Sequence, residues 1–444
     1  MEELKHSHNR QLFSTLSSIA TMRYLKVTCI IILFAWISFF PQPIQDQYRF
    51  YARIFFLGFL LLLVFNKTSA RQIFSFHDWP LWLFMISMSS GMVLAIDKNT
   101  AIAVYFYIII TFFLLFYIGK GFCKTEQDRT LICALLCIFG SLVAIIGFME
   151  LYFGRNILYE SFIVNPYYDK FIGPTLPLGL ERYERYTSRP MSTQLEPSIL
   201  GAYLLVCLPF SLYFFKNKLF YLRLLGILSS VLCIVMIILS LSRVTFLALI
   251  IVLLFYLWYK HKRRIIIVLA CFILLISIGS CYPDSKLSRY GISEMVYGRY
   301  DSIVSEHRFS RIIMTAKIIK DSPFFGVGFN HFRIRFNEYC NKEEKEKVPY
   351  EYMVPDNMYL TFLAETGIIG TTSFLIFIFL LLKRAIRKYN WLKDSYRRHF
   401  LLISISALIG LLVNMAGYEL FYWYNPFMFF CLLSGLIAFE SDEH

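Results

Sequence analysis

Arginine residues gather in two long polar intervals of an otherwise apolar chain. A guanidinium group binds phosphate through paired hydrogen bonds and keeps its charge even when it is buried. This concentration predicts an anionic partner, and the residues alone leave phospholipid headgroups and a polyprenyl pyrophosphate both open. The first interval, 153–198, holds Arg182, Arg185 and Arg189, and the second, 282–358, holds Arg299, Arg308, Arg311, Arg333 and Arg335.

A further arginine, Arg243, stands between two apolar runs with only Ser242 as a polar neighbour. An ionisable residue in such a place is costly, so it usually faces a cavity or a partner. The alternative is a tight turn at the membrane surface, from which the long side chain reaches water. The first interpretation makes Arg243 a candidate binding residue.

The second polar interval closes with Pro355, Asp356 and Asn357, directly before a long apolar run. Asp356 or Asn357 could be the N-cap of the following helix. Alternatively, the Asp356 carboxylate faces the arginines and takes a proton from a sugar hydroxyl. Tyr359 lies three residues after Asp356 and would share its helix face. Glu365, deeper in the run, predicts either a cavity residue or a paired one.

Several other kinds of site are not expected. The glycines of PFFGVGF follow no strand and precede no Lys-Ser or Lys-Thr, so they predict the end of a helix over 305–321 rather than a nucleotide loop. His331 has no second metal ligand near it, and the ten cysteines form no C-x-x-C, so neither a metal site nor a cofactor is predicted. Cys281 and Cys340 could pair in an oxidising compartment, which spacing alone leaves open.

The elements that must position these residues are membrane helices. The chain is 57% hydrophobic and only 17% charged, whereas a soluble domain is nearer a quarter charged. About twelve apolar segments are long enough to cross a bilayer, which predicts an all-α polytopic membrane protein. The predicted segments are 25–40, 50–65, 79–96, 101–118, 131–152, 199–215, 224–241, 244–259, 265–281, 359–382, 400–416 and 420–439.

Orientation follows from the short loops, because lysine and arginine collect on the cytoplasmic side. The loops KNKLFYLR, KHKRR and KRAIRKYN fall on the same side as both termini, whereas PQPIQDQ and DKNT fall on the other. No cleavable signal peptide is predicted. Both polar intervals then lie outside, as a first outer loop over 153–198 and a large outer loop over 282–358 that caps the site. We expect a single membrane domain over 1–444.

Four segments, in this order, resemble the O-antigen ligase and O-antigen polymerase superfamily of bacterial envelope glycosyltransferases. They are SRPMSTQLEPSILGAYLLVCLPF, LSLSRVTFLALIIV, HRFSRIIMTAKIIKDSPFFGVGFNHF and PDNMYLTFLAETGIIG. The resemblance implies a metal-independent, inverting, GT-C-like transferase of the bacterial inner membrane, with an undecaprenyl-pyrophosphate-linked glycan as donor. By motif position, Arg189, Arg243 and Arg308 would hold the pyrophosphate and stabilise it as it leaves.

The remaining candidates follow from the same motifs. Arg308 and Asp356 are the candidate catalytic residues, and Arg311, Asn357 and Tyr359 join Arg189 and Arg243 as substrate-binding candidates. Ligases of the superfamily typically carry His-Asn where this chain carries Asp356-Asn357. The change favours a polymerase, which extends a lipid-linked glycan, over a ligase acting on lipid A core or another acceptor.

A transporter is the alternative from another class, although the chain shows no internal repeat of the kind that transporters usually have. The bilayer and the lipid-linked glycan are the expected partners, a chain-length regulator stays open as another, and nucleic acid is not expected.

Overall fold

The structure is a computed structural model in which every described element is a helix. The described residues are 23–40, 42–64, 79, 81–82, 85, 89, 92, 95, 97–154, 156, 189–194, 196–260, 302–339 and 355–442. Their longer helices are 23–39, α2 (Gln42–Val64), α5 (Lys98–Phe122), α6 (Glu126–Phe153), α10 (Pro197–Ser211), α11 (Phe220–Leu239), α12 (Arg243–Lys260), α15 (Ser302–Asp321), α18 (Met358–Trp391), α19 (Ser395–Asn414) and α20 (Tyr424–Asp442). Shorter ones are η2 (Ser192–Gln194), η3 (Leu212–Lys216), α16 (Phe332–Tyr339) and η7 (Leu420–Tyr422).

Membrane-spanning helices dominate this part of the chain. Seven described helices are long and apolar enough to cross a bilayer, and two shorter apolar helices accompany them. The protein is therefore a multi-pass membrane protein, as the composition predicts. The predicted segments 265–281 and most of 79–96 lie outside the described residues, so the count of twelve stays a prediction. The seven are Val104–Phe122, Glu126–Phe153, Pro197–Lys216, Phe220–Leu239, Arg243–Lys260, Met358–Trp391 and Ser395–Asn414, and the two are Phe50–Val64 and Tyr424–Phe439.

Two helix boundaries bear on the sequence predictions. Helix α15 ends at Asp321 as predicted, directly before the PFFGVG turn. Helix α18, by contrast, continues nine residues past the predicted end at Leu382 and stops at Trp391. Lysine and arginine are good helix formers, and they are stabilised near the carboxyl end of a helix, so the basic stretch after the apolar run extends the helix.

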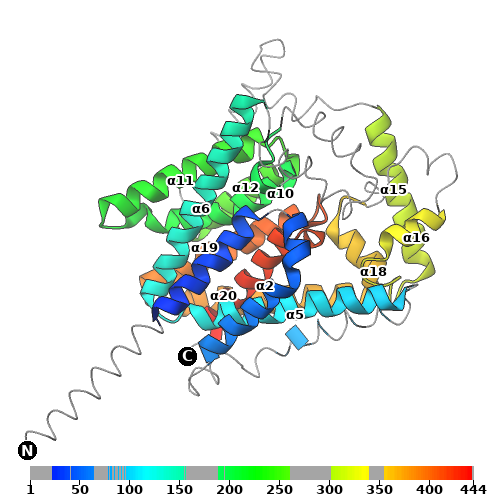
Figure 1. Cartoon of the computed structure of the whole chain (residues 1–444), viewed down its shortest axis with the longest axis horizontal. Coiled ribbons are helices and arrows are strands. Elements are labelled where there is room, and N and C mark those ends of the chain that lie inside the picture. The colour runs from blue at the N-terminus through cyan, green and yellow to red at the C-terminus, as the bar shows by residue number, and fades with distance from the viewer. Residues whose placement is uncertain are drawn as a thin grey trace, which may run out of the picture.

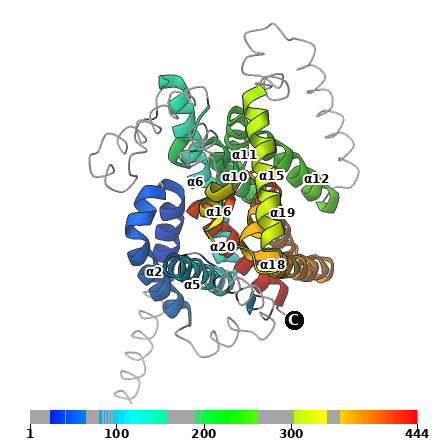
Figure 2. The same ribbon diagram turned by 90° about the vertical axis from the view of Figure 1, so that its right-hand side faces the viewer.

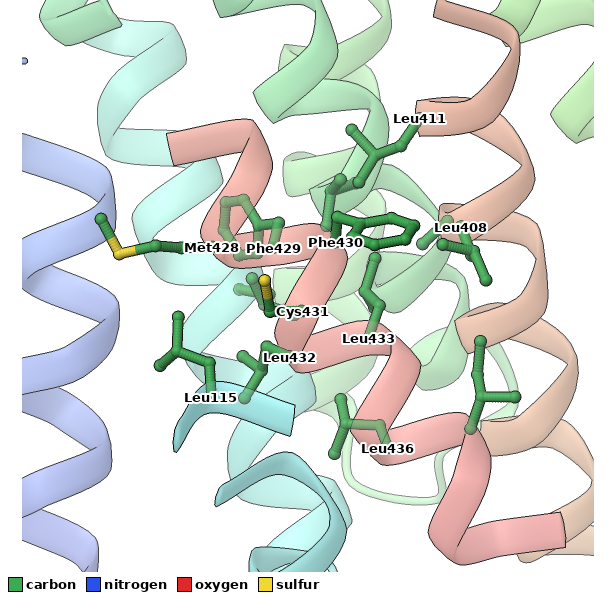
Figure 3. Packing of buried hydrophobic residues seen from close by; sticks show 14 of the residues in the cluster. Leu115, Leu408, Leu411, Met428, Phe429, Phe430, Cys431, Leu432, Leu433 and Leu436 are labelled. Atoms are coloured by element: carbon green, nitrogen blue, oxygen red, sulfur yellow. The ribbon is translucent and has the colours of Figure 1, made fainter. Parts of the chain in front are cut away.

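Helix α20 forms the centre of the bundle (Figure 1). Its apolar side chains are buried, and Figure 3 shows Leu432 beside Leu115 of α5, with Phe430 pointing toward Leu408 of α19. Two glycines let α5 and α20 approach closely. A Cβ atom added at Gly435 would lie 1.9 Å from the Phe116 carbonyl oxygen, and one at Gly119 would lie 2.5 Å from the Leu432 oxygen. Small residues at such crossings are common in membrane helices, where close packing drives association.

The two ends of the bundle differ in character. Figure 2 looks onto the end that α15 and α16 cover, with α18, α19 and α20 behind them. The opposite end carries the ends of η3, α12 and α18, where basic residues such as Lys216, Lys260 and Lys388 lie. There, the Tyr389 hydroxyl donates to the Tyr259 carbonyl oxygen, and Lys260 contacts His399. The bundle therefore separates a basic end from the end that α15 and α16 cover.

Candidate active site

Loops that are far apart in the sequence meet at the end of the bundle that α15 and α16 cover (Figure 2). The Arg189 Nε atom donates to the Ser240 carbonyl oxygen at 3.0 Å, which joins the first polar interval to the turn before α12. The Asn357 side chain donates to the Ala416 carbonyl oxygen at 2.9 Å, and the Met358 amide donates to that of Met415 at 2.8 Å. The structure therefore gathers candidates from separate motifs around the 415–419 loop that follows α19.

Asp356 and Arg311 form an ion pair at this end of the bundle. The Arg311 Nη2 atom lies 3.1 Å from Asp356 Oδ2, and the side chains are 8% and 25% exposed. Asp356 adopts a φ of 50°, a left-handed conformation that few residues other than glycine, asparagine and aspartate adopt readily. This conformation turns the chain out of the polar interval into α18. Two residues predicted from different motifs are thus in direct contact.

Asn357 and Tyr359 have structural partners within the protein. The Asn357 side-chain oxygen accepts hydrogen bonds from the backbone amides of Tyr359 and Leu360 at 3.0 and 3.1 Å. Of the two N-cap candidates, it is therefore Asn357 that caps α18. The Tyr359 hydroxyl donates to the Leu412 carbonyl oxygen at 2.7 Å, which ties α18 to α19. These bonds orient the site, while contact of either residue with substrate stays a prediction.

Glu419 belongs to this cluster, although the sequence interpretation does not include it. It is buried in the loop between α19 and η7, and its Oε1 atom accepts the Asn357 amide hydrogen at 3.1 Å. Burial, together with the nearby Asp356 carboxylate, raises the pKa of Glu419 to about 8. One signal in the sequence could have found it, because Glu419 is a lone carboxylate between two apolar segments.

The arginine candidates differ in burial and in the number of bonds that their side chains make within the protein. Arg189 is buried, with its Nε atom bonded to the turn at Ser240. Arg243 begins α12 just after Leu241, whose φ is 51°, and its side chain is exposed. Among the described residues, no hydrogen bond or ion pair engages the Arg243 side chain. The junction is therefore a tight turn whose arginine reaches outward, and its guanidinium is open to a ligand.

Contacts of the next residues place Arg243 beside the 415–419 loop. Thr245 accepts a hydrogen bond from Asn414 at the end of α19, with Asn414 Nδ2 2.9 Å from Thr245 Oγ1. A Cβ atom at Gly417 would lie only 2.1 Å from Val244, so the loop lies directly against the start of α12. Arg308 lies on α15 one turn before Arg311, so the two share a helix face. The Arg308 side chain lies outside the described part of the structure.

The PFFGVG turn docks onto a break in α18. At Gly367, with φ 68° and ψ −172°, the helix is interrupted. The amides of Val327 and Gly328 donate to the carbonyls of Ala364 and Glu365, at 2.9 and 3.0 Å. In return, the Ile368 amide donates to the Pro323 carbonyl at 2.8 Å. These bonds satisfy backbone groups that the broken helix leaves unpaired. Because the turn follows α15 directly, it also fixes this helix, and with it Arg311, against α18.

Glu365 and His331 support the same docking. Glu365 is fully buried and accepts hydrogen bonds from the Tyr422 hydroxyl and the Phe332 amide, so it is a paired residue. In the described part of the chain, the His331 ring bonds to backbone atoms of Phe329 and Asp97. Within the described ranges, no three His, Cys, Asp or Glu side chains converge as metal ligands. Cys281 and Cys340, the predicted disulfide pair, lie outside the described residues.

Substituting Gly367 by alanine should destabilise the fold more than the same change at Gly154. Both glycines have a positive φ, 68° and 67°, so each variant bears left-handed strain of about 1–2 kcal/mol. At Gly367, the new Cβ would also lie 2.2 Å from the Phe324 carbonyl oxygen, whereas nothing lies within 4 Å of it at Gly154. Thermal unfolding of the two purified variants would measure the difference, and equal midpoints would contradict the docking.

Comparison with known families finds a match for the central part of the chain. Residues 228–375 match a family model described as O-antigen ligase. This part of the chain is similar to the O-antigen ligase family. The match spans α12, α15, the PFFGVG turn and the break in α18, so it includes three of the four segments on which the resemblance to the O-antigen ligase and polymerase superfamily rests. The first segment, with Arg189, lies before the match. No curated protein matches the chain.

Proposed function

We propose that this protein polymerises O-antigen or exopolysaccharide repeat units carried on undecaprenyl pyrophosphate. The observation that carries the proposal is the ion pair between Arg311 and Asp356, which lies next to the buried Glu419 and near the exposed Arg243. Guanidinium groups can bind the pyrophosphate through paired hydrogen bonds, and a carboxylate can take the proton from the acceptor hydroxyl. A family domain described as O-antigen ligase supports the same reaction class.

The reaction we propose is a single displacement. The acceptor sugar hydroxyl attacks the anomeric carbon of the donor, its proton passes to a carboxylate, and the bond from that carbon to the pyrophosphate oxygen breaks. Arg189, Arg243 and Arg308 hold the leaving pyrophosphate and offset its growing charge. Asp356 and Glu419 are the two carboxyl groups placed to take the proton. Displacement in one step inverts the configuration at the anomeric carbon.

The active end faces away from the cytoplasm in this proposal. The described basic residues at the ends of η3, α12 and α18 lie at the other end of the bundle, and loops rich in lysine and arginine mark the cytoplasmic side. This orientation places both termini in the cytoplasm and the reaction at the outer face of the bacterial inner membrane. Donor and acceptor would both reach the site from the bilayer.

A ligase is the second candidate, and the description of the matched family favours it. The Asp356-Asn357 pair in place of His-Asn favours the polymerase. Glycan profiling in a strain lacking the gene separates the two. Single repeat units on the final acceptor indicate lost polymerisation, and long chains accumulating on the lipid carrier indicate lost ligation. An unchanged profile would overturn both assignments and favour transport.

Transfer should continue when divalent ions are removed. The arginines supply the positive charge that a metal ion would otherwise bring to the pyrophosphate. Purified protein in lipid, given a synthetic polyprenyl-pyrophosphate glycan, should form product at the same rate with and without EDTA. A loss of product that magnesium or manganese restores would contradict the metal-independent mechanism.

A further inference from the structure

A second polar cluster lies at the basic end of the bundle, away from the candidate active site. The His399 Nε2 atom is 2.9 Å from Lys260 Nζ and 3.0 Å from the Tyr256 hydroxyl, and Lys260 also contacts that hydroxyl. The His399 ring stacks on Tyr213, with centroids 5.6 Å apart and planes at 26°. The cluster thus joins η3, α12 and α19, which all begin or end here.

The positive charge of this cluster has no described counter-charge. Lys260 is half-buried, and the exposed Lys216 is close enough to act electrostatically on both Lys260 and His399. Among the described residues, no carboxylate forms an ion pair with Lys216 or Lys260. In the sequence, the four residues after Lys260 are HKRR, none of which is acidic. A charge that is partly removed from water is stabilised by a counter-charge, so an anion from outside the chain would complete this group.

The contacts of Lys260 leave part of its ammonium group available to bind that anion. An ammonium group has three donors, and the hydroxyl of Tyr256 and the ring nitrogen of His399 accept two of them. The third donor remains for a ligand, and Lys216 offers a second ammonium nearby. The His399 ring contacts both Tyr213 and Tyr256, with the Tyr256 ring centroid at 6.0 Å. The ammonium is therefore held in place by side chains that carry no negative charge.

We infer that Lys260, His399, Tyr256 and Lys216 form a binding site for a phosphate group at the basic face of the bundle. Its position at the ends of three candidate membrane spans fits a phosphate group of an anionic phospholipid. Basic pockets between membrane helices bind such headgroups on the cytoplasmic side. The site is separate from the proposed transferase chemistry and does not depend on it.

The test is the thermal midpoint of the full-length protein in nanodiscs. Adding phosphatidylglycerol to phosphatidylcholine discs should raise the midpoint by about 5 °C, because a ligand that binds only the folded state stabilises it. The Lys260→Gln variant and the Lys216→Gln variant should each lose at least half of this shift. Inorganic phosphate, added to discs of phosphatidylcholine alone, shows whether a free phosphate serves as well as a headgroup.

A matched control is Lys218→Gln, which removes the same charge two residues from Lys216. Lys218 is exposed and outside the cluster, so this variant should keep the wild-type shift. If only phosphatidylglycerol raises the thermal midpoint, the ligand is the lipid headgroup. If inorganic phosphate raises the midpoint as well, the site binds any phosphate group that can reach it. No shift in the wild-type protein with either, or equal shifts in all three variants, would overturn the proposal.

Discussion

Replacing Arg243 by alanine should lower glycan transfer by about 100- to 1,000-fold, the range seen when one group that stabilises a developing negative charge is removed. The fold should not change, because the side chain is exposed and makes no described contact within the protein. Arg189 and Arg311 do not allow so clean a test, since both are buried and bonded to other parts of the chain. A loss at Arg243 therefore reports on a ligand rather than on folding.

The conservative variant and a matched arginine sharpen this test. Arg243→Lys keeps the charge but loses the fork that binds two phosphate oxygens at once, so it should restore only part of the rate. Arg335 lies on α16 at the same end of the bundle, partly exposed and paired with Glu338 at 2.6 Å. Arg335→Ala should leave transfer near the wild-type rate. Normal activity in Arg243→Ala, with expression and thermal midpoint unchanged, would rule out Arg243 as a pyrophosphate ligand.

The membrane helices could be predicted from sequence because length and hydropathy alone define them. Helix α15 and the turn after it were predicted for a similar local reason, since glycines at a helix end mark a change of direction. At Gly367 the local mark is the glycine itself, and a glycine within an apolar run does not by itself end a helix. The surrounding segment reads as one apolar run, and the break exists because the PFFGVG turn supplies the hydrogen bonds that it needs.

The sequence predicts which residues belong to the site, but it does not predict which of them are in contact. Arg311 and Asp356 were both candidates, yet nothing in their separation of 45 positions indicates an ion pair. Asn357 as N-cap was a local choice between two neighbours, and backbone geometry decided it. Glu419 was missed because its role depends on burial and on the Asp356 charge, which the folded arrangement creates. Sequence motifs thus locate the parts of this site, and tertiary contacts give them their chemistry.

Glu419→Gln should reduce transfer by about 100- to 10,000-fold if Glu419 is the base, the usual range for a lost general base. Glutamine keeps the oxygen that accepts the Asn357 amide hydrogen, so the 415–419 loop should stay in place. The pH dependence of the transfer rate gives a second test of Glu419 as the base. With a pKa of about 8, the carboxyl group is protonated below that pH and cannot accept a proton, so the wild-type rate should rise as pH increases through 8.

The Asp356→Asn variant shows which of the two carboxyl groups, Asp356 or Glu419, acts as the base. The Asp356 charge contributes to the raised pKa of Glu419, so its removal should lower that pKa and move the rising limb of the profile to lower pH. A base at Asp356 would give the reverse pattern, with transfer lost in Asp356→Asn and retained in Glu419→Gln. Asp356→Asn also leaves Arg311 without its carboxylate, so thermal unfolding should accompany each rate measurement. A displaced pH limb cannot come from a purely structural defect, because lost folding lowers the rate without moving the pH at which the base ionises.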